Sequence, residues 1–346
     1  MKPARWPVTD YLIDSPITLA KHIGQSRDLW QLKENDSGER GWQLSAPEIF
    51  SALRSPDAME SAKQFFFAPR ENIFQFDGNQ FRESLPAPEP FALVGVSSCD
   101  LTAIAYQDHF FRDDPHYQAR RQQALLVGYE CLSPCAKGFC PSVDAGPGAR
   151  EGSADLVLHQ LQEDQWLLRV LTDTGARALE GLVLEKAGDA AQTQRHNQIE
   201  ACIEAFPDDS HIHAGIEAIN SNSVAQETWD AAGIQCLSCS GCTTLCPTCS
   251  CYGTSDHTTG DTMIRERFWD SCLYDGFQRE ASQNNPAGAA GDRVRRFWYH
   301  KFSREFFQAS DNPGPADRYG CVGCGRCEVT CPGVIGVHSM MKKITE

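Results

Sequence analysis

The clearest pattern of apolar positions lies between residues 90 and 171. The uninterrupted apolar run FALVGV at 91–96 has the length of a buried strand, and ALLVGY at 124–129 is a second run of the same kind. Between them, DLTAIAYQDHFF at 100–111 predicts a helix that opens on an aspartate. Strand, helix and strand in this order predict a βαβ unit, and therefore an α/β domain whose sheet is at least partly parallel.

Further elements are predicted on both sides of this unit. We expect helices at 15–23 and 46–53, strands at 154–159 and 166–171, and a helix at about 174–185. The polar, alanine-rich segment 187–230 predicts one helix on either side of FPDDSHIH. We place a domain boundary near Ala231, where the density of cysteines rises. The expected division is an N-terminal α/β (α+β) domain at 1–230 and a second domain at 231–346.

Two amphipathic patterns predict that the second domain is mainly α-helical. Apolar residues recur at helical spacing in 261–280 and again in 292–307, and the segment 282–291 between them predicts a loop. The residues are Ile264, Phe268, Cys272 and Leu273 in the first segment, and Val294, Phe297, Trp298, Phe302 and Phe306 in the second. A helical ferredoxin-type domain is therefore expected, rather than a compact ferredoxin built from β-hairpins.

The second domain contains one cysteine motif twice. The spacing C-x2-C-x2-C-x3-C, followed by proline, occurs at Cys236, Cys239, Cys242 and Cys246 and again at Cys321, Cys324, Cys327 and Cys331. This run is typical of ferredoxins with two [4Fe–4S] clusters, in which the fourth cysteine of each motif binds the other cluster. The alternative is zinc, whose sites usually join two separated C-x2-C pairs in one tetrahedron, a spacing that fits less well.

We therefore expect cross-ligation between the two motifs. The first cluster is assigned to Cys236, Cys239, Cys242 and Cys331, and the second cluster to Cys321, Cys324, Cys327 and Cys246. Because each motif completes the other, the two clusters should be close neighbours.

Four more cysteines lie near the ends of the two best-predicted strands. They are Cys99, Cys131, Cys135 and Cys140, and Cys99 and Cys131 come shortly after the strands at 91–96 and 124–129. The carboxyl ends of parallel strands meet at the edge of a sheet where α/β proteins build their sites. We expect these four thiols to hold a third iron–sulfur cluster, with a zinc site or unligated cysteines as alternatives, because the spacing matches no standard motif.

The remaining cysteines are not expected to be ligands. Cys249 and Cys251 follow the first motif closely and are predicted to pack around a cluster. Cys202 and Cys272 fall on apolar helix faces and are predicted to be ordinary buried thiols.

Basic residues concentrate at 293–304, amid aromatic ones. The residues are Arg293, Arg295, Arg296, Lys301 and Arg304. They either place positive charge beside anionic clusters or an acidic partner, or form a solvated helix face whose aliphatic stems cover apolar surface.

Composition and charge narrow the functional classes. The chain has 346 residues and a formal net charge of −15, which argues against nucleic acid, because binding phosphates needs a concentrated positive face. The longest apolar runs are far shorter than the roughly 20 residues of a membrane span, and the start shows no secretory or twin-arginine signal. We expect a cytoplasmic protein without a span. Its 16 cysteines then indicate metal or cluster binding rather than disulfides.

Motifs for two-electron chemistry are not evident. The segments GPGARE at 146–151 and GCGRCE at 323–328 lack the final glycine of a dinucleotide fingerprint, and there is no P-loop, nucleophile elbow or HExxH motif. The chain is therefore expected to be a non-catalytic electron-transfer component that works with a partner.

Several segments together resemble a known family, from about residue 60 to the end. The residues are KQFFFAPRENIFQF (63–76), GVSSCDLTAI (95–104), GYECLSPCAKGFC (128–140), CLSCSGCTTLCPTCSCY (236–252), RFWDSC (267–272) and GCVGCGRC (320–327). They resemble the beta subunit of cytosolic NAD(P)-linked nickel–iron hydrogenases (sulfhydrogenases) and the similar A subunit of anaerobic sulfite reductase. GVSSCD departs from the family pattern, which has an arginine–proline pair before this cysteine.

The resemblance implies partners and a relay role. Such subunits pass electrons between a gamma-type subunit, which carries flavin and binds NAD(P)H, and a catalytic unit. That unit is either the small and large subunits of a nickel–iron hydrogenase, which we favour, or a sirohaem sulfite reductase subunit. A different class of function is a stand-alone enzyme that binds flavin and reduces sulfur or a disulfide at Cys131, Cys135 or Cys140.

Overall fold

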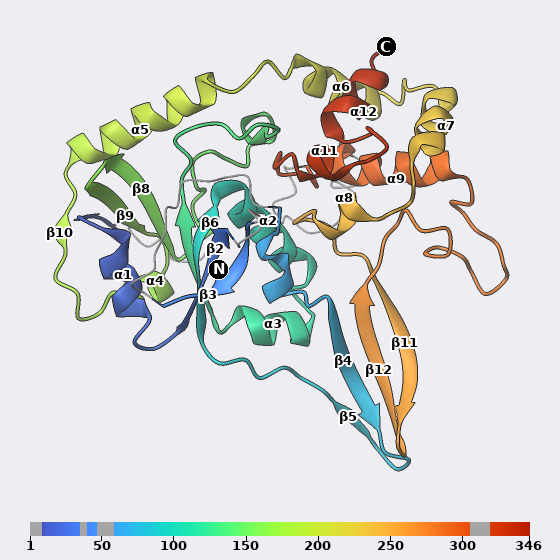
Figure 1. Cartoon of the computed structure of the whole chain (residues 1–346), viewed down its shortest axis with the longest axis horizontal. Helices are drawn as coiled ribbons and strands as arrows, with labels where there is room; N and C mark the ends of the chain where they lie inside the picture. Colours follow the sequence, from blue (N-terminus) through green and yellow to red (C-terminus); the bar gives the residue numbers. More distant parts are fainter. Residues whose placement is uncertain (1–8, 35–39, 47–58, 305–318) are drawn as a thin grey trace, which may run out of the picture.

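The computed structural model of the chain describes residues 9–34, 40–46, 59–304 and 319–346, and Figure 1 shows their arrangement. The larger of two sheets has the strand order β10-β1-β9-β8-β7-β6-β2-β3. Its strands are β1 (Thr9–Ile13), β2 (Asp28–Glu34), β3 (Arg40–Leu44), β6 (Phe91–Ser97), β7 (Ala124–Tyr129), β8 (Leu156–Gln162), β9 (Gln165–Val170) and β10 (Glu185–Lys186). The predicted helix at 46–53 falls almost entirely outside the described residues.

The predicted βαβ unit forms the centre of this sheet. β6, helix α2 (Ser98–Phe110) and β7 follow one another, and β6 pairs in parallel with both β7 and β2. β7 is also parallel to β8, whereas β9, β1, β10 and β3 join the sheet through antiparallel pairs. The α/β class and the strands predicted at 91–96, 124–129, 154–159 and 166–171 are confirmed.

Both faces of the central strands are buried, which explains their continuous apolar sequence. On one face Leu93 and Leu126 pack with Leu101 of α2. On the other face Leu125 packs in a core that includes Leu19 of α1 (Pro16–Ile23). A strand covered on both sides has no need for alternating polar residues.

The smaller sheet corrects one prediction. Its order is β11-β12-β4-β5, and it extends away from the larger sheet in Figure 1. Its strands are β4 (Arg70–Phe76), β5 (Phe81–Glu83), β11 (Tyr252–Thr259) and β12 (Thr262–Trp269). The helix predicted at 261–280 is therefore wrong, since its first half is β12, the second strand of a β-hairpin.

Buried charged residues explain why the spacing of apolar residues at 261–280 predicted a helix where the structure has a strand. The residues of β12 with the least exposure are Glu266 and Arg267, not the apolar ones. They are buried because Glu266 pairs with Arg70 and the Arg267 Nε donates to Glu71 Oε1 at 3.0 Å, both on the neighbouring strand β4. The hairpin turns at Gly260 and Asp261, and the φ of Gly260 is +60°. A glycine–aspartate pair between two threonine-rich runs is a hairpin signal.

The remaining helices only partly follow the predictions, because those at 115–121, 241–244, 326–330 and 337–343 were not predicted. They are α3 (Pro115–Arg121), α4 (Asp173–Ala178), α5 (Asp189–Glu204), α6 (Ser210–Asn220), α7 (Gln226–Gln235), α8 (Gly241–Thr244), α9 (Ala290–Phe302), α11 (Arg326–Thr330) and α12 (Val337–Lys343), with short 3-10 turns η2 (Ala62–Phe65) and η3 (Cys140–Val143). The helix predicted at 174–185 ends early at Ala178, because Gly181 has a left-handed φ of +91° and Glu185–Lys186 joins the sheet.

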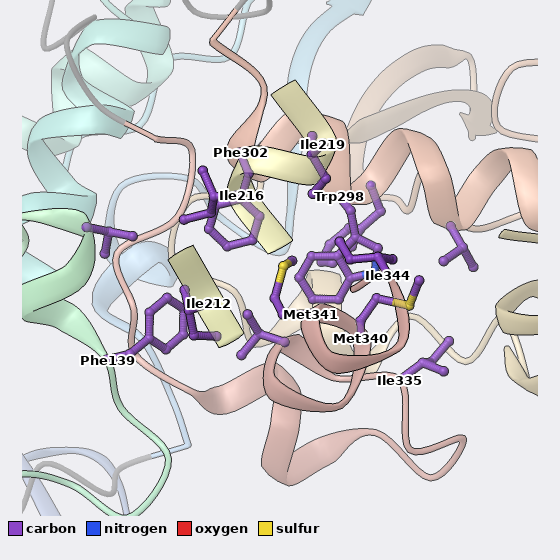
Figure 2. Packing of buried hydrophobic residues seen from close by; sticks show 14 of the residues in the cluster. Phe139, Ile212, Ile216, Ile219, Trp298, Phe302, Ile335, Met340, Met341 and Ile344 are labelled. Atoms are coloured by element: carbon purple, nitrogen blue, oxygen red, sulfur yellow. The ribbon is translucent and has the colours of Figure 1, made fainter. Parts of the chain in front are cut away.

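A third core lies among the helices that follow residue 209. Figure 2 shows Ile212 and Ile216 of α6, Phe302 of α9 and Met341 of α12 around it, and Phe139 contributes from the loop after β7. This core and the pairing of β4 with β12 both join residues on the two sides of Ala231. The division of the chain near Ala231 stays a prediction. In the parts of the chain described, no helix is both long and apolar enough to cross a membrane.

Candidate metal centres

The two cysteine motifs have the same backbone conformation. Ser238 and Ser240 in the first motif have φ values of 49° and 61°, and the equivalent Gly323 and Gly325 in the second have values of 65° and 72°. In each motif the second of these left-handed residues caps a short helix, α8 or α11. The repeat in sequence is therefore also a repeat in structure.

The second motif has glycine where the first has serine because its loop is packed against another segment. A Cβ atom at Gly323 would lie 2.6 Å from the Cα of Cys140, and one at Gly325 would meet the carbonyl of Lys137. The backbone N–H of Phe139 donates to the Gly323 carbonyl at 2.8 Å. The loop that carries Cys135 and Cys140 thus lies directly on the second motif.

Four thiols from both motifs line one cavity. They are Cys236, Cys239, Cys242 and Cys331, and the other walls are largely apolar, with Leu273, Val294, Phe297, Trp298 and Ile335. The Ile335 N–H points toward Cys331 Sγ at 3.5 Å. Burial, with the neighbouring thiols Cys236, Cys246, Cys331 and Cys239, raises the pKa of Cys242 to about 12. The fourth cysteine of the second motif therefore lies with the first three of the first motif.

The reciprocal group contains Cys321, Cys324, Cys327 and Cys246. Burial, together with Cys324 and Cys246, raises the pKa of Cys321 to about 12, and burial with Cys321, Cys324 and Cys246 raises the pKa of Cys327. The Gly323 N–H points at Cys321 Sγ at 3.4 Å. Thr248, whose Oγ1 is 3.2 Å from Cys246 Sγ, donates to the Gly320 carbonyl at 2.7 Å. These contacts hold Cys246 beside the second motif.

Two buried lysines lie beside Cys246. Lys301 of α9 is 5% exposed, and its Nζ is 3.0 Å from Thr248 Oγ1 and 3.3 Å from Cys249 Sγ. Burial opposes its charge, but the thiols of Cys246 and Cys249 hold the pKa of Lys301 well above its usual range. Lys63 donates to the carbonyls of Thr243 and Thr244, and burial lowers its pKa. In the basic segment, Lys301 places positive charge beside the cysteines, whereas Arg304 is exposed.

A buried ion pair fixes the second motif to the large sheet's helix α2. Arg326, which stands between Cys324 and Cys327, binds both carboxylate oxygens of Asp100, at 2.6 and 2.7 Å, with both side chains buried. Such a bidentate pair sets orientation as well as energy. Neither this pair nor the role of Lys63 was predicted from the sequence, because none of these residues carries a local signal.

The donor set fits iron–sulfur clusters better than zinc. Among the described residues, no three His, Cys, Asp or Glu side chains meet closely enough to hold a single metal ion. The thiolates of a [4Fe–4S] cluster bind different iron atoms, so they need not converge on one point. Apolar walls, N–H groups directed at sulfur and a buried cation are the surroundings that such a cluster uses. A metal replaces the proton of each thiol that binds it, so these cysteines would bind as thiolates.

The third predicted set is only partly assembled in one place. Cys131 follows β7 and Cys140 begins η3, with Cys135 between them. Cys99, in the first turn of α2, has its Sγ 3.3 Å from Ser97 Oγ. Burial, then Asp100, Cys140 and Cys324, raises the pKa of Cys99, so both Cys140 and a cysteine of the second motif are among its neighbours. The assignment of Cys99, Cys131, Cys135 and Cys140 to one cluster stays a prediction.

Comparisons with known proteins agree with this geometry. The model of the 4Fe-4S dicluster domain family matches residues 235–335, which include both motifs. The chain is 30% identical over 294 residues to sulfhydrogenase 2 subunit beta of Pyrococcus furiosus, an alignment that covers 82% of this chain and 82% of that protein. No solved structure matches the chain. From identity of this extent, together with the two cysteine motifs inside a dicluster domain, we conclude that the chain belongs to the family of sulfhydrogenase beta subunits.

Proposed function

We propose that this chain relays electrons between a flavin-carrying, NAD(P)H-binding subunit and the catalytic subunits of a nickel–iron hydrogenase. The observation that carries the proposal is the exchange of the fourth cysteines between the two motifs. Cys331 lines a cavity with Cys236, Cys239 and Cys242, while Cys246 lies beside Cys321, Cys324 and Cys327. Because each motif would supply one ligand to the other cluster, the two clusters would be held close together. An electron relay needs neighbouring redox centres of this kind.

The ligands in this proposal are the eight motif cysteines. Cys236, Cys239, Cys242 and Cys331 would hold the first cluster, and Cys321, Cys324, Cys327 and Cys246 the second. When bound, these clusters supply one-electron redox chemistry. The chain's own residues position the thiols, exclude water from them and place Lys301 beside Cys246 and Cys249.

The positions of the groups support passage across the chain. Cys239, at one end, is exposed, so a redox centre of a partner subunit can approach the first cluster. The loop with Cys135 and Cys140 lies on the second motif. The same arrangement of clusters would serve both hydrogen production and hydrogen oxidation.

Co-purification tests the choice of complex. A tagged chain is expressed in its native host, isolated anaerobically, and its partners are identified by mass spectrometry and metal analysis. We expect nickel, large and small hydrogenase subunits and a flavin-binding subunit in stoichiometric amounts. Sirohaem and a sulfite reductase subunit in their place would assign the chain to sulfite reduction instead.

A second test addresses the stand-alone enzyme. The chain purified anaerobically on its own should be brown, lack flavin after desalting and show no oxidation of NAD(P)H. Bound flavin together with reduction of sulfur or a disulfide would overturn the relay role.

A further inference from the structure

We propose that the chain has a third iron–sulfur site, formed by the thiols of Cys131, Cys135, Cys140 and Cys202, with Cys202 rather than Cys99 as the fourth ligand. The proposal deepens the relay function and rests on it for its purpose, but its ligands are argued from the contacts of helix α5 with the loop after β7. Cys202 comes from helix α5, which lies along β8 in Figure 1 and is far in sequence from the other three.

Helix α5 turns one narrow face toward the protein. Of its 16 residues only Ile199 and Cys202 are buried. Arg195, Ile199 and Cys202 are spaced by four and three positions and therefore share a helix face. Cys202 is one of only two buried residues on this polar helix, so its thiol faces the part of the protein on which the helix packs.

This helix face packs against the loop that carries the other three cysteines. Near the middle of α5, the Arg195 Nε donates to Glu130 Oε2 at 2.6 Å, and Glu130 directly precedes Cys131. One turn further, Ile199 Cγ2 would lie 3.5 Å from a Cβ atom at Gly148. The neighbouring Pro147 carbonyl accepts from the Cys131 N–H at 3.3 Å.

The chain beyond α5 returns to the same loop. A Cβ atom placed at Gly138 would lie 3.7 Å from Phe206 Cε1, and this Cβ atom would also collide with Cys135 Sγ. Cys202 lies between Ile199 and Phe206 in sequence, and contacts on both sides of it reach the loop from 131 to 148. The Cys202 side chain is therefore held over this loop.

The electrostatic neighbours agree with this placement. Burial, followed by Cys135 and Cys202, raises the pKa of Cys131 to about 12. Burial and Cys135 raise the pKa of Cys202 to about 11. Burial, with Cys131, Cys135 and Cys202, raises the pKa of Cys140 as well. Cys202 thus acts on Cys131 and Cys140, and Cys135 acts on Cys202, whereas Cys99 has Cys324 of the second motif as well as Cys140 among its neighbours.

Four thiols beside the second cysteine motif, of which Cys140 and Cys202 are buried and Cys131 and Cys135 partly buried, favour a third [4Fe–4S] cluster. All four donors are sulfur, the ligand type that such clusters use. The Phe139 N–H, one residue before Cys140, donates to the Gly323 carbonyl and so keeps this group against the second cluster loop. Cys99 lies between the two groups, where a thiol can influence both without binding iron.

Iron analysis of the whole chain tests the proposal. The wild-type chain, isolated or reconstituted anaerobically, should contain about twelve iron and about twelve acid-labile sulfide atoms, the content of three four-iron clusters. Cys202→Ser and Cys202→Ala should each lose about four irons and one set of electron paramagnetic resonance signals. Cys99→Ser is the matched control and should keep about twelve.

The possible results distinguish the ligand assignment from the existence of the cluster. The ligand assignment is wrong if either Cys202 variant keeps about twelve irons, or if Cys99→Ser alone loses about four. A wild-type chain with about eight irons overturns the third cluster whatever the variants do, and stoichiometric zinc without extra sulfide replaces it with a zinc site. Because iron content does not depend on which subunits co-purify, the relay function and the third site can fail independently.

Discussion

The ammonium group of Lys301 is buried and lies 3.3 Å from the thiol of Cys249. It also lies beside Cys246, the cysteine of the first motif that is assigned to the second cluster. A buried positive charge at this place stabilises additional negative charge on a nearby cluster. We therefore predict that Lys301→Met lowers the reduction potential of the second cluster. The shift is measured by redox titration followed by electron paramagnetic resonance.

The matched control for Lys301 is Arg304, whose side chain is 55% exposed. Because water and salt screen an exposed charge, Arg304→Met should leave the potential unchanged. Equal shifts in both variants would mean that overall charge, rather than the position of Lys301, sets the potential.

The exchange of fourth cysteines predicts a crossed pattern of damage. Cys331→Ser should alter the spectrum of the cluster held mainly by Cys236, Cys239 and Cys242, although Cys331 belongs to the other motif. Cys246→Ser should alter the cluster held by Cys321, Cys324 and Cys327. Mössbauer and paramagnetic resonance spectra of the two variants distinguish the clusters. If each variant damages the cluster of its own motif, the cross-ligation is wrong.

Gly323 provides a test of how tightly the second motif is packed. A Cβ atom there would lie 2.6 Å from the Cα of Cys140, and its φ of 65° is in the left-handed region. For an ordinary residue the left-handed region alone costs roughly 1–2 kcal/mol. Gly323→Ala should therefore lower the thermal midpoint and the iron content, and Ser238→Ala, at the equivalent position of the first motif, should change both little. Similar losses in the two variants would argue against the close contact.

The buried pair of Arg326 and Asp100 predicts an asymmetric response. Arg326→Gln leaves the Asp100 carboxylate buried without its partner, which should cost roughly 3–5 kcal/mol of the free energy of unfolding. The double variant Arg326→Met with Asp100→Leu should lose much less, because no unpaired charge remains. Denaturant unfolding under anaerobic conditions measures both. An exposed pair, Arg265 with Asp256, is the control, and Arg265→Gln should have no measurable effect.

An element could be predicted when its own residues show which of its faces are buried, and could not be predicted when that depends on residues far away in the sequence. β6 and β7 were predictable because both faces of these strands are buried, which leaves continuous apolar runs such as 91–96. β12 was not, because its buried residues Glu266 and Arg267 are charged and are neutralised by Arg70 and Glu71, almost 200 positions away. Only the turn at Gly260 marked the hairpin locally.

The same distinction holds for the candidate site. Spacing within a motif is local, so the eight motif cysteines could be grouped from the sequence. In the structure Cys331 lines one cavity with Cys236, Cys239 and Cys242, and the assignment of all eight cysteines to two clusters stays a prediction. Lys63, Lys301 and Cys202 reach the cysteines only through the packing of distant elements. Cys202 looked like an ordinary buried thiol, and its partners become visible only when α5 is placed against the loop after β7.

The relay role is tested most directly in the purified complex with the Cys331→Ser chain. NAD(P)H-linked hydrogen production should fall at least tenfold, because the first cluster is part of the path, while hydrogen oxidation with a dye that reacts at the hydrogenase subunits should stay near the wild-type rate. Wild-type NAD(P)H-linked turnover in a variant shown spectroscopically to lack the first cluster would contradict the account.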